Sequence, residues 1–172
     1  MNLSRATFLL CAVGAILAFP SSCSSGKSQV LTFPIGQKVQ VGKLFYQVIE
    51  AQWMAEAQGA KQPPKNRILQ LRLTVTNRGA QEASLPFLRL LDAAGTEIVE
   101  LSELEGNPAW MGVLRHLQPA LTEEGTVYFD VPVGAYKLEV VDNSNADEEK
   151  IAYIEIPASL APPPQPLGSS GK

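Results

Sequence analysis

One stretch of the chain reads Leu69-Gln70-Leu71-Arg72-Leu73-Thr74-Val75-Thr76, with an apolar residue at every second position. Because successive side chains of a β-strand point to opposite faces, this period of two predicts a half-buried antiparallel strand. Similar alternation occurs in residues 39–41, 44–54, 127–131, 136–141 and 151–156, and apolar stretches at 87–91 and 97–101 flank a predicted turn. About seven or eight short strands joined by turns, without helical connections, predict an all-β antiparallel sandwich.

The composition excludes several classes of function. The chain has 172 residues, of which 45% are hydrophobic and 18% charged, with a formal net charge of −3. An acidic chain of this kind does not bind nucleic acid by general electrostatic attraction. One histidine, His116, and two cysteines leave little material for metal clusters or histidine-based catalysis. Because hydrolase, nucleotide-phosphate and dinucleotide motifs are also missing, we expect no enzyme, no cofactor and no nucleic-acid partner.

Residues 1–22 have the organisation of a lipoprotein-type signal peptide. A short basic segment precedes an uncharged apolar run over residues 6–19, which is shorter than the roughly 20 residues that span a bilayer. The small residues Ser21 and Ser22 then precede Cys23. This order resembles the lipobox of bacterial lipoproteins, although Pro20 stands where an aliphatic residue is usual. Cys23 is therefore the expected lipidation site, and ordinary secretory cleavage nearby is the alternative.

The motifs between residues 35 and 142 resemble, in their order and spacing, a family of bacterial immunoglobulin-like domains of unknown function. These motifs are Ile35-Gly36-Gln37-Lys38-Val39-Gln40-Val41-Gly42, Thr74-Val75-Thr76-Asn77-Arg78-Gly79, the segment 87–97, and Gly125-Thr126-Val127-Tyr128-Phe129-Asp130-Val131-Pro132. Pro119-Ala120-Leu121 departs from the Pro-Gly-Glu that is common there. Such domains occur mostly in secreted proteins and lipoproteins, including a secreted mycobacterial antigen. The resemblance implies export and an immunoglobulin-like sandwich, and it implies no catalytic residues.

Four segments follow from these patterns. Residues 1–22 are the expected signal peptide and residues 23–34 a tether. The immunoglobulin-like β-sandwich is expected over residues 35–156. Residues 157–172, with five prolines followed by Gly and Ser residues, are the expected disordered tail. The tail has two interpretations, a solvated extension or a proline-rich ligand for another domain.

The acidic segment 142–149 is a candidate calcium loop. Hard cations need several oxygen ligands at close spacing, and Asp142, Asp147 and Glu148 are the weak candidates. The EF-hand register fails because Ala146 occupies the fifth position. A solvated hairpin turn is the alternative interpretation, and we expect no metal site.

The connection over residues 102–121 is longer than the usual loop of about four to six residues. Asn107 and Pro108 there are suited to the start of a short helix, with Trp110 on one face. That face either plugs the end of the sandwich or leaves Trp110 and Met111 exposed as a partner-binding site.

Together these features predict a non-enzymatic, exported, lipid-anchored binding or structural module of the bacterial cell envelope. Its expected partners are the membrane, through the N-terminal lipid, and an envelope protein. The alternative function is a ligand or calcium carrier that uses the 142–149 loop or a cleft between the sheets. The alternative location is a secreted form.

Overall fold

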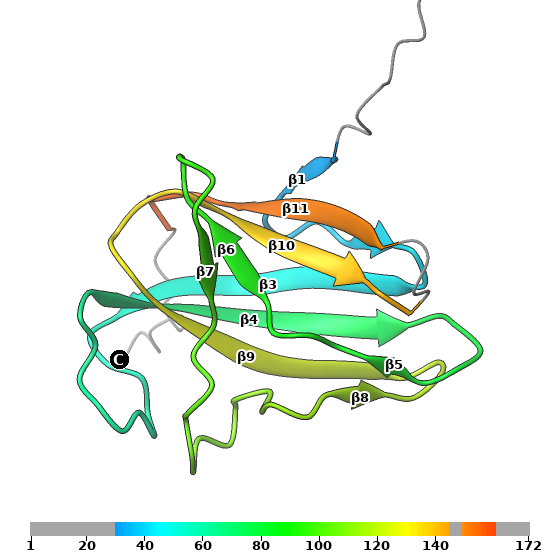
Figure 1. The fold of residues 1–172 in the computed structure, drawn as a ribbon, viewed down its shortest axis with the longest axis horizontal. Coiled ribbons are helices and arrows are strands. Elements are labelled where there is room, and N and C mark those ends of the chain that lie inside the picture. The colour runs from blue at the N-terminus through cyan, green and yellow to red at the C-terminus, as the bar shows by residue number, and fades with distance from the viewer. Residues whose placement is uncertain (1–29, 145–148, 161–172) are drawn as a thin grey trace, which may run out of the picture.

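The structure is a computed structural model that describes residues 30–144 and 149–160 (Figure 1). In this part the chain forms eleven strands and no helix. One sheet has the order β1 (Thr32–Pro34), β11 (Lys150–Ile156), β10 (Tyr136–Asp142), β6 (Arg89–Leu91) and β7 (Glu97–Val99). The other has the order β2 (Val39–Val41), β3 (Leu44–Met54), β4 (Arg67–Asn77) and β9 (Thr122–Val131), and β5 (Ala83–Ser84) pairs with β8 (His116–Leu117).

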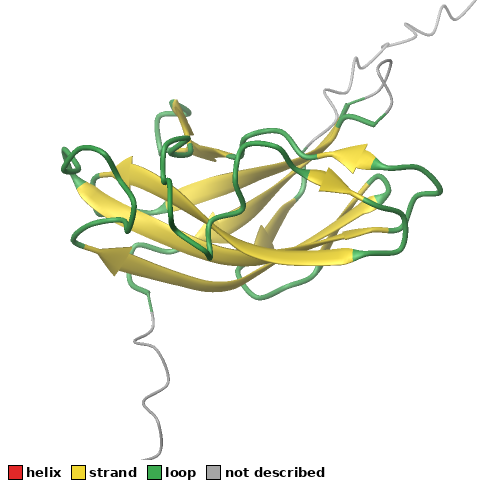
Figure 2. Cartoon of the chain, turned by 90° about the horizontal axis from the view of Figure 1, so that it is seen from below, coloured by secondary structure: helices red, strands yellow, loops and turns green. Residues whose placement is uncertain are grey.

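The two larger sheets form two layers around the main core, which confirms the expected sandwich (Figure 2). Leu69, Leu71, Leu73 and Val75 of β4 point into this core and are at most 1% exposed. The inward residues of β9 and β10 meet them from both layers. Since each buried side chain of this size contributes about 1.5–3 kcal/mol, the alternating strands supply much of the stability of the fold.

A second, smaller core covers part of the outer face of the four-stranded sheet. Ile68 and Tyr128 point away from the main core, yet they are only 1% and 4% exposed. Leu104 and Ala57, from the connections on either side, pack over them, with Trp110 at the margin. Strand β4 is therefore buried on both faces at its start, which a simple alternation does not predict.

The described residues form eleven strands, more than the seven or eight expected from the sequence. Residues 32–34, expected in the tether, form β1, which pairs in parallel with β11 while Phe33 packs on the core. At the other end, Leu160, which falls in the segment expected as the tail, packs on the core, and residues 161–172 lie outside the described part of the chain. Strands of two or three residues are too short to show a hydrophobic period, so the sequence does not predict them.

The prediction of a short helix after Asn107 is wrong, because the chain forms no helix there. The Asn107 side chain instead accepts a hydrogen bond from the Ala109 N–H and donates to the Tyr128 hydroxyl. The backbone of residues 109–111 bonds to Thr126 of β9, so its polar groups are satisfied without a helix. Gly112 follows with a φ of 74°, which ends any helical path.

A buried ion pair fixes the same connection to the sandwich. The guanidinium of Arg115 donates two hydrogen bonds to the carboxylate of Glu100, at 2.7 and 2.8 Å, and the two side chains are 2% and 0% exposed. Glu100 also accepts a hydrogen bond from the Leu88 N–H, and Arg115 donates to the Gly112 carbonyl. A carboxylate and a guanidinium are stable in this interior only because each satisfies the other.

Candidate functional site

Several residues singled out in the sequence lie outside the described part of the chain. They are Cys23, the expected lipidation site, and Asp147 and Glu148 of the candidate calcium loop. In residues 30–144 and 149–160, no helix is long and apolar enough to cross a bilayer.

Asp142 lies at the end of β10, where its carboxylate is occupied by the backbone. One oxygen accepts the Lys43 N–H at 2.6 Å and the other accepts the Ser144 N–H at 2.9 Å. Burial alone raises the pKa of this carboxyl, but the hydrogen bonds from Ser144 and Lys43 outweigh it and hold the pKa below its usual value. Asp142 thus closes the turn between β2 and β3 onto the end of β10, and the described residues bring no cluster of three metal-ligating side chains together.

Trp110 and Met111 are half-buried, and they pack on different cores. Trp110 lies against the second core on the outer face of the four-stranded sheet, and its indole N–H is buried with no hydrogen-bond partner. Met111 packs against the main core and over Gly125. A partner-binding role for the two stays a prediction, and the position they occupy is the edge of the four-stranded sheet along β9.

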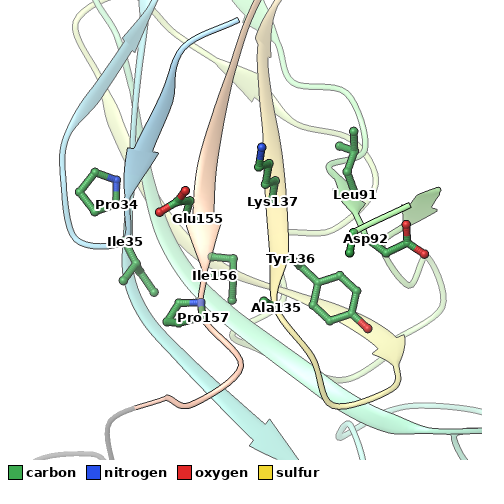
Figure 3. Close-up of a pocket in the computed structure, with 11 residues that line it drawn as sticks. Pro34, Ile35, Leu91, Asp92, Ala135, Tyr136, Lys137, Glu155, Ile156 and Pro157 are labelled. Carbon is green, nitrogen blue, oxygen red and sulfur yellow. The ribbon is translucent and has the colours of Figure 1, made fainter. Parts of the chain in front are cut away.

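A groove of about 400 Å³ opens at the end of the five-stranded sheet where β11 ends (Figure 3). Its lining comes from the end of β1, the turn after β6, the start of β10 and the end of β11. Most of the lining is apolar, namely Pro34, Ile35, Leu91, Ala93, Ala135, Tyr136, Ile156 and Pro157. Asp92, Lys137 and Glu155 are the charged residues that line it.

The lateral wall of the groove is fixed by hydrogen bonds. The Asp92 carboxylate accepts the N–H groups of Ala94 and Thr96, both at 2.8 Å, and these bonds, that of Thr96 first, hold the pKa of Asp92 below its usual value. The Tyr136 hydroxyl donates to the Pro132 carbonyl at 2.7 Å, and the ring of Tyr136 lies 6.5 Å from that of Trp53. The groove therefore has a preformed shape, which lowers the entropic cost of binding.

Two charged side chains lie on the floor of the groove. Lys137 and Glu155 face each other across β10 and β11 as register partners on the outer face. No histidine, serine or cysteine lines the groove. His116, the one histidine of the chain, lies on β8 next to Glu82 and Ser84. Such a site presents apolar surface with a few polar groups at its margin, which is the usual composition of a ligand pocket.

Sequence reasoning missed this groove. The prediction placed a possible cleft between the two sheets, whereas the groove lies at the end of one sheet. Pro34, Asp92, Tyr136 and Pro157 are far apart in the chain and come together only through the pairing of β1, β11, β10 and β6. No local motif marks them.

The comparisons with known proteins give a family and a fold. A family model described as a domain of unknown function (DUF4352) matches residues 33–151. Among solved structures, yjhA of Bacillus subtilis has a TM-score of 0.54 at 17% identity, with 71% of this chain and 98% of that chain covered. A candidate lipoprotein of Bacillus subtilis, ycdA, has a TM-score of 0.58 at 14% identity, with 70% and 38% covered.

The secreted protein MPT63 of Mycobacterium tuberculosis has a TM-score of 0.52 at 14% identity, with 75% of this chain and 99% of that chain covered. At these identities the likeness concerns the fold, and it agrees with the two-layer architecture described above. No curated protein matches the chain.

Proposed function

The chain belongs to the family of domains of unknown function DUF4352, and from this premise we propose that it is an exported, lipid-anchored binding module of the bacterial cell envelope that performs no catalysis. The groove at the end of β11 is the binding site in this proposal.

The N-terminal segment supports export and anchoring. An apolar run, two small residues and Cys23 precede the fold, and a candidate lipoprotein and a secreted protein are among the structures with a similar fold. Nine residue steps separate Cys23 from Thr32, the first residue of β1. Since an extended chain advances at most about 3.3–3.6 Å per residue, an anchor on Cys23 keeps the sandwich within roughly 30 Å of the membrane.

The position of the groove supports its proposed role as the binding site. Thr32 pairs with Tyr153 and Pro34 pairs with Glu155, so β1 runs in the same direction as β11 and both strands point toward the groove. The chain thus enters the sheet upstream of the groove, which opens at the far end. In this proposal a module tethered through Cys23 presents the apolar groove past Pro34, at the end of the sheet where β1 and β11 finish, and an envelope partner reaches it there.

Photo-crosslinking in cells tests this proposal. A benzoylphenylalanine at Ala94, an exposed position in the turn beside the groove, is expected to form an adduct with a membrane-associated partner. The matched control is the same group at Ala80, an exposed alanine in a turn at the opposite end of β4. Equal adducts at both positions, or none at Ala94, would contradict the groove as the binding site.

A further inference from the structure

We propose that two copies of this chain pair through β7, so that their five-stranded sheets join edge to edge about a two-fold axis at Ile98. The contact is β7 against the antiparallel β7 of a second copy. This inference goes beyond the proposed function, because it concerns an edge of the sheet and not the groove.

Strand β7 is an edge of its sheet, with backbone groups that face outward. It pairs with β6 on one side only. The Glu100 N–H, just after β7, donates to the Leu88 carbonyl, just before β6. Because backbone groups of a strand alternate in direction, those of Ile98 also point toward β6, whereas those of Glu97 and Val99 point away from it. Two N–H groups and two carbonyl groups are therefore available to a further strand.

The edge of the other sheet along β9 is already covered. The Met111 N–H donates to the Thr126 carbonyl of this strand. The Leu101 N–H donates to the Tyr128 carbonyl of the same strand, so the open edge of β7 ends at Val99. An edge with only two outward-facing residues gives a small interface, and we expect a weak, reversible dimer.

A two-fold axis at Ile98 uses all the outward groups of β7. Ile98 then lies opposite Ile98 of the second copy, and Glu97 lies opposite Val99 of the second copy. The reciprocal pair forms as well, because a two-fold contact repeats each interaction. The two pairs form four backbone hydrogen bonds, and the side chain of Val99, which is 52% exposed, becomes covered.

Charge and hydrogen bonding select this register. A charge on an edge strand usually opposes pairing, and an axis at Glu97 would set two carboxylates opposite each other. An axis at Val99 would need the Leu101 N–H, which the Tyr128 carbonyl already accepts. With the axis at Ile98, Glu97 of the second copy lies two strand spacings, about 10 Å, from the backbone of Arg89, a span that the two long side chains can bridge.

Sedimentation equilibrium of the chain from residue 24, without lipid, tests the pairing. The mass should rise with concentration toward that of two chains. Val99→Glu places a carboxylate opposite Glu97 of the second copy twice per dimer and should weaken dimerisation about tenfold. Val99→Lys places an ammonium there and should strengthen it.

The matched control is Val133→Glu, at a valine that is 60% exposed in the turn between β9 and β10, and it should leave dimerisation unchanged. A wild-type mass that stays that of one chain at about 1 mM would overturn the proposal. Equal weakening by Val99→Glu and Val99→Lys would also overturn it, because an apolar contact without the Glu97 pairing predicts that result.

Single cysteines test the register. The chain from residue 24 contains no cysteine, so each substitution gives one thiol per copy. Ile98→Cys sets two thiols opposite each other at the axis, where the Cα atoms are about 4.5 Å apart and a disulfide can form. The Cα atoms of Val99→Cys lie beyond the disulfide limit of about 7 Å, so this variant should stay reduced. No disulfide-linked dimer from Ile98→Cys, or as much from Val99→Cys, would overturn the proposed axis.

Discussion

The two ends of the sandwich differ in how their polar and apolar groups are used. At the hairpin end, where the chain passes from β10 to β11, Asp142 and Asn77 are buried, and their side chains form hydrogen bonds with backbone groups. At the groove end, where β11 finishes, apolar side chains from four segments line an opening that no described residue fills. The hairpin end thus holds the fold together, and the groove end has the surface that is free for binding.

Breaking the buried ion pair should have the largest effect and should show how strongly the connection over residues 102–121 is held to the sandwich. Glu100→Gln leaves the guanidinium of Arg115 without its carboxylate, and we expect a loss of about 3–5 kcal/mol in the free energy of unfolding, measured with urea.

The matched control for that experiment is Glu97→Gln. Glu97 pairs with Arg89 at 3.7 Å, and both side chains are about half exposed. Exposed pairs are worth at most about 1 kcal/mol, so the loss should be small. Similar losses for the two glutamates would show that the buried pair is not a main support of the fold.

The substitution Trp110→Ala tests how much packing on the outer face near the start of β4 contributes to stability. Large-to-small changes of fully buried aromatic residues cost about 3–5 kcal/mol, and for the half-buried Trp110 we expect a loss of about 2–3 kcal/mol. Thermal melting measures it. A melting temperature that stays at the wild-type value, together with weaker capture of an envelope partner, would instead favour the partner-binding role of Trp110 and Met111.

A pair of glycines, both with a positive φ, compares the packing at the two ends. Gly42, at the hairpin end, has a φ of 56°, and Gly95, in the turn beside the groove, has a φ of 82°. A Cβ on Gly42 would collide with the Asp142 carboxylate, whereas one on Gly95 meets nothing within 4 Å. The left-handed backbone costs both alanine variants about 1–2 kcal/mol, so the extra loss of Gly42→Ala in urea unfolding isolates the packing at the hairpin end. Equal losses would contradict the difference between the ends.

Asp142→Asn should lower stability by about 1–2 kcal/mol at neutral pH, because the amide accepts only one of the two backbone N–H groups. The pKa of Asp142 is lowered in the folded protein, so its stabilisation is complete above the unfolded pKa of about 3.9 and is lost as the pH falls through the folded value. Urea unfolding of wild type and variant should therefore converge on acidification. A difference that stays constant down to low pH would contradict the role of the ionised carboxylate.

The smallest effect is expected at the groove. Ala93 is exposed and fills no core position, so Ala93→Trp should change the free energy of unfolding by no more than about 0.5 kcal/mol. The same variant should abolish partner crosslinking from the neighbouring position Ala94. A large destabilisation would show that the groove end, like the hairpin end, is part of what holds the fold.

The long strands could be predicted from the sequence, and the groove could not. The alternation from Leu69 to Val75 predicts the inward face of β4 because one buried face imposes a period of two. Strands β1 and β8 have three and two residues and show no period. The pairing of Glu100 with Arg115 and the meeting of Pro34 with Tyr136 depend on contacts between distant segments, which no local pattern encodes.

The helix expected near Trp110 failed for a related reason. The residues of that segment satisfy helix-start preferences, but the edge of β9 offers their backbone an alternative set of hydrogen bonds. Tertiary pairing therefore decided the conformation against local propensity.

The intact mass of the protein extracted from membranes tests the anchored module most directly. The account predicts a chain that begins at Cys23 and carries a diacylglyceryl adduct on its thiol, with Cys23→Ser released from the membrane fraction as the control. A soluble mature form that begins after Cys23, with no lipid, would contradict it.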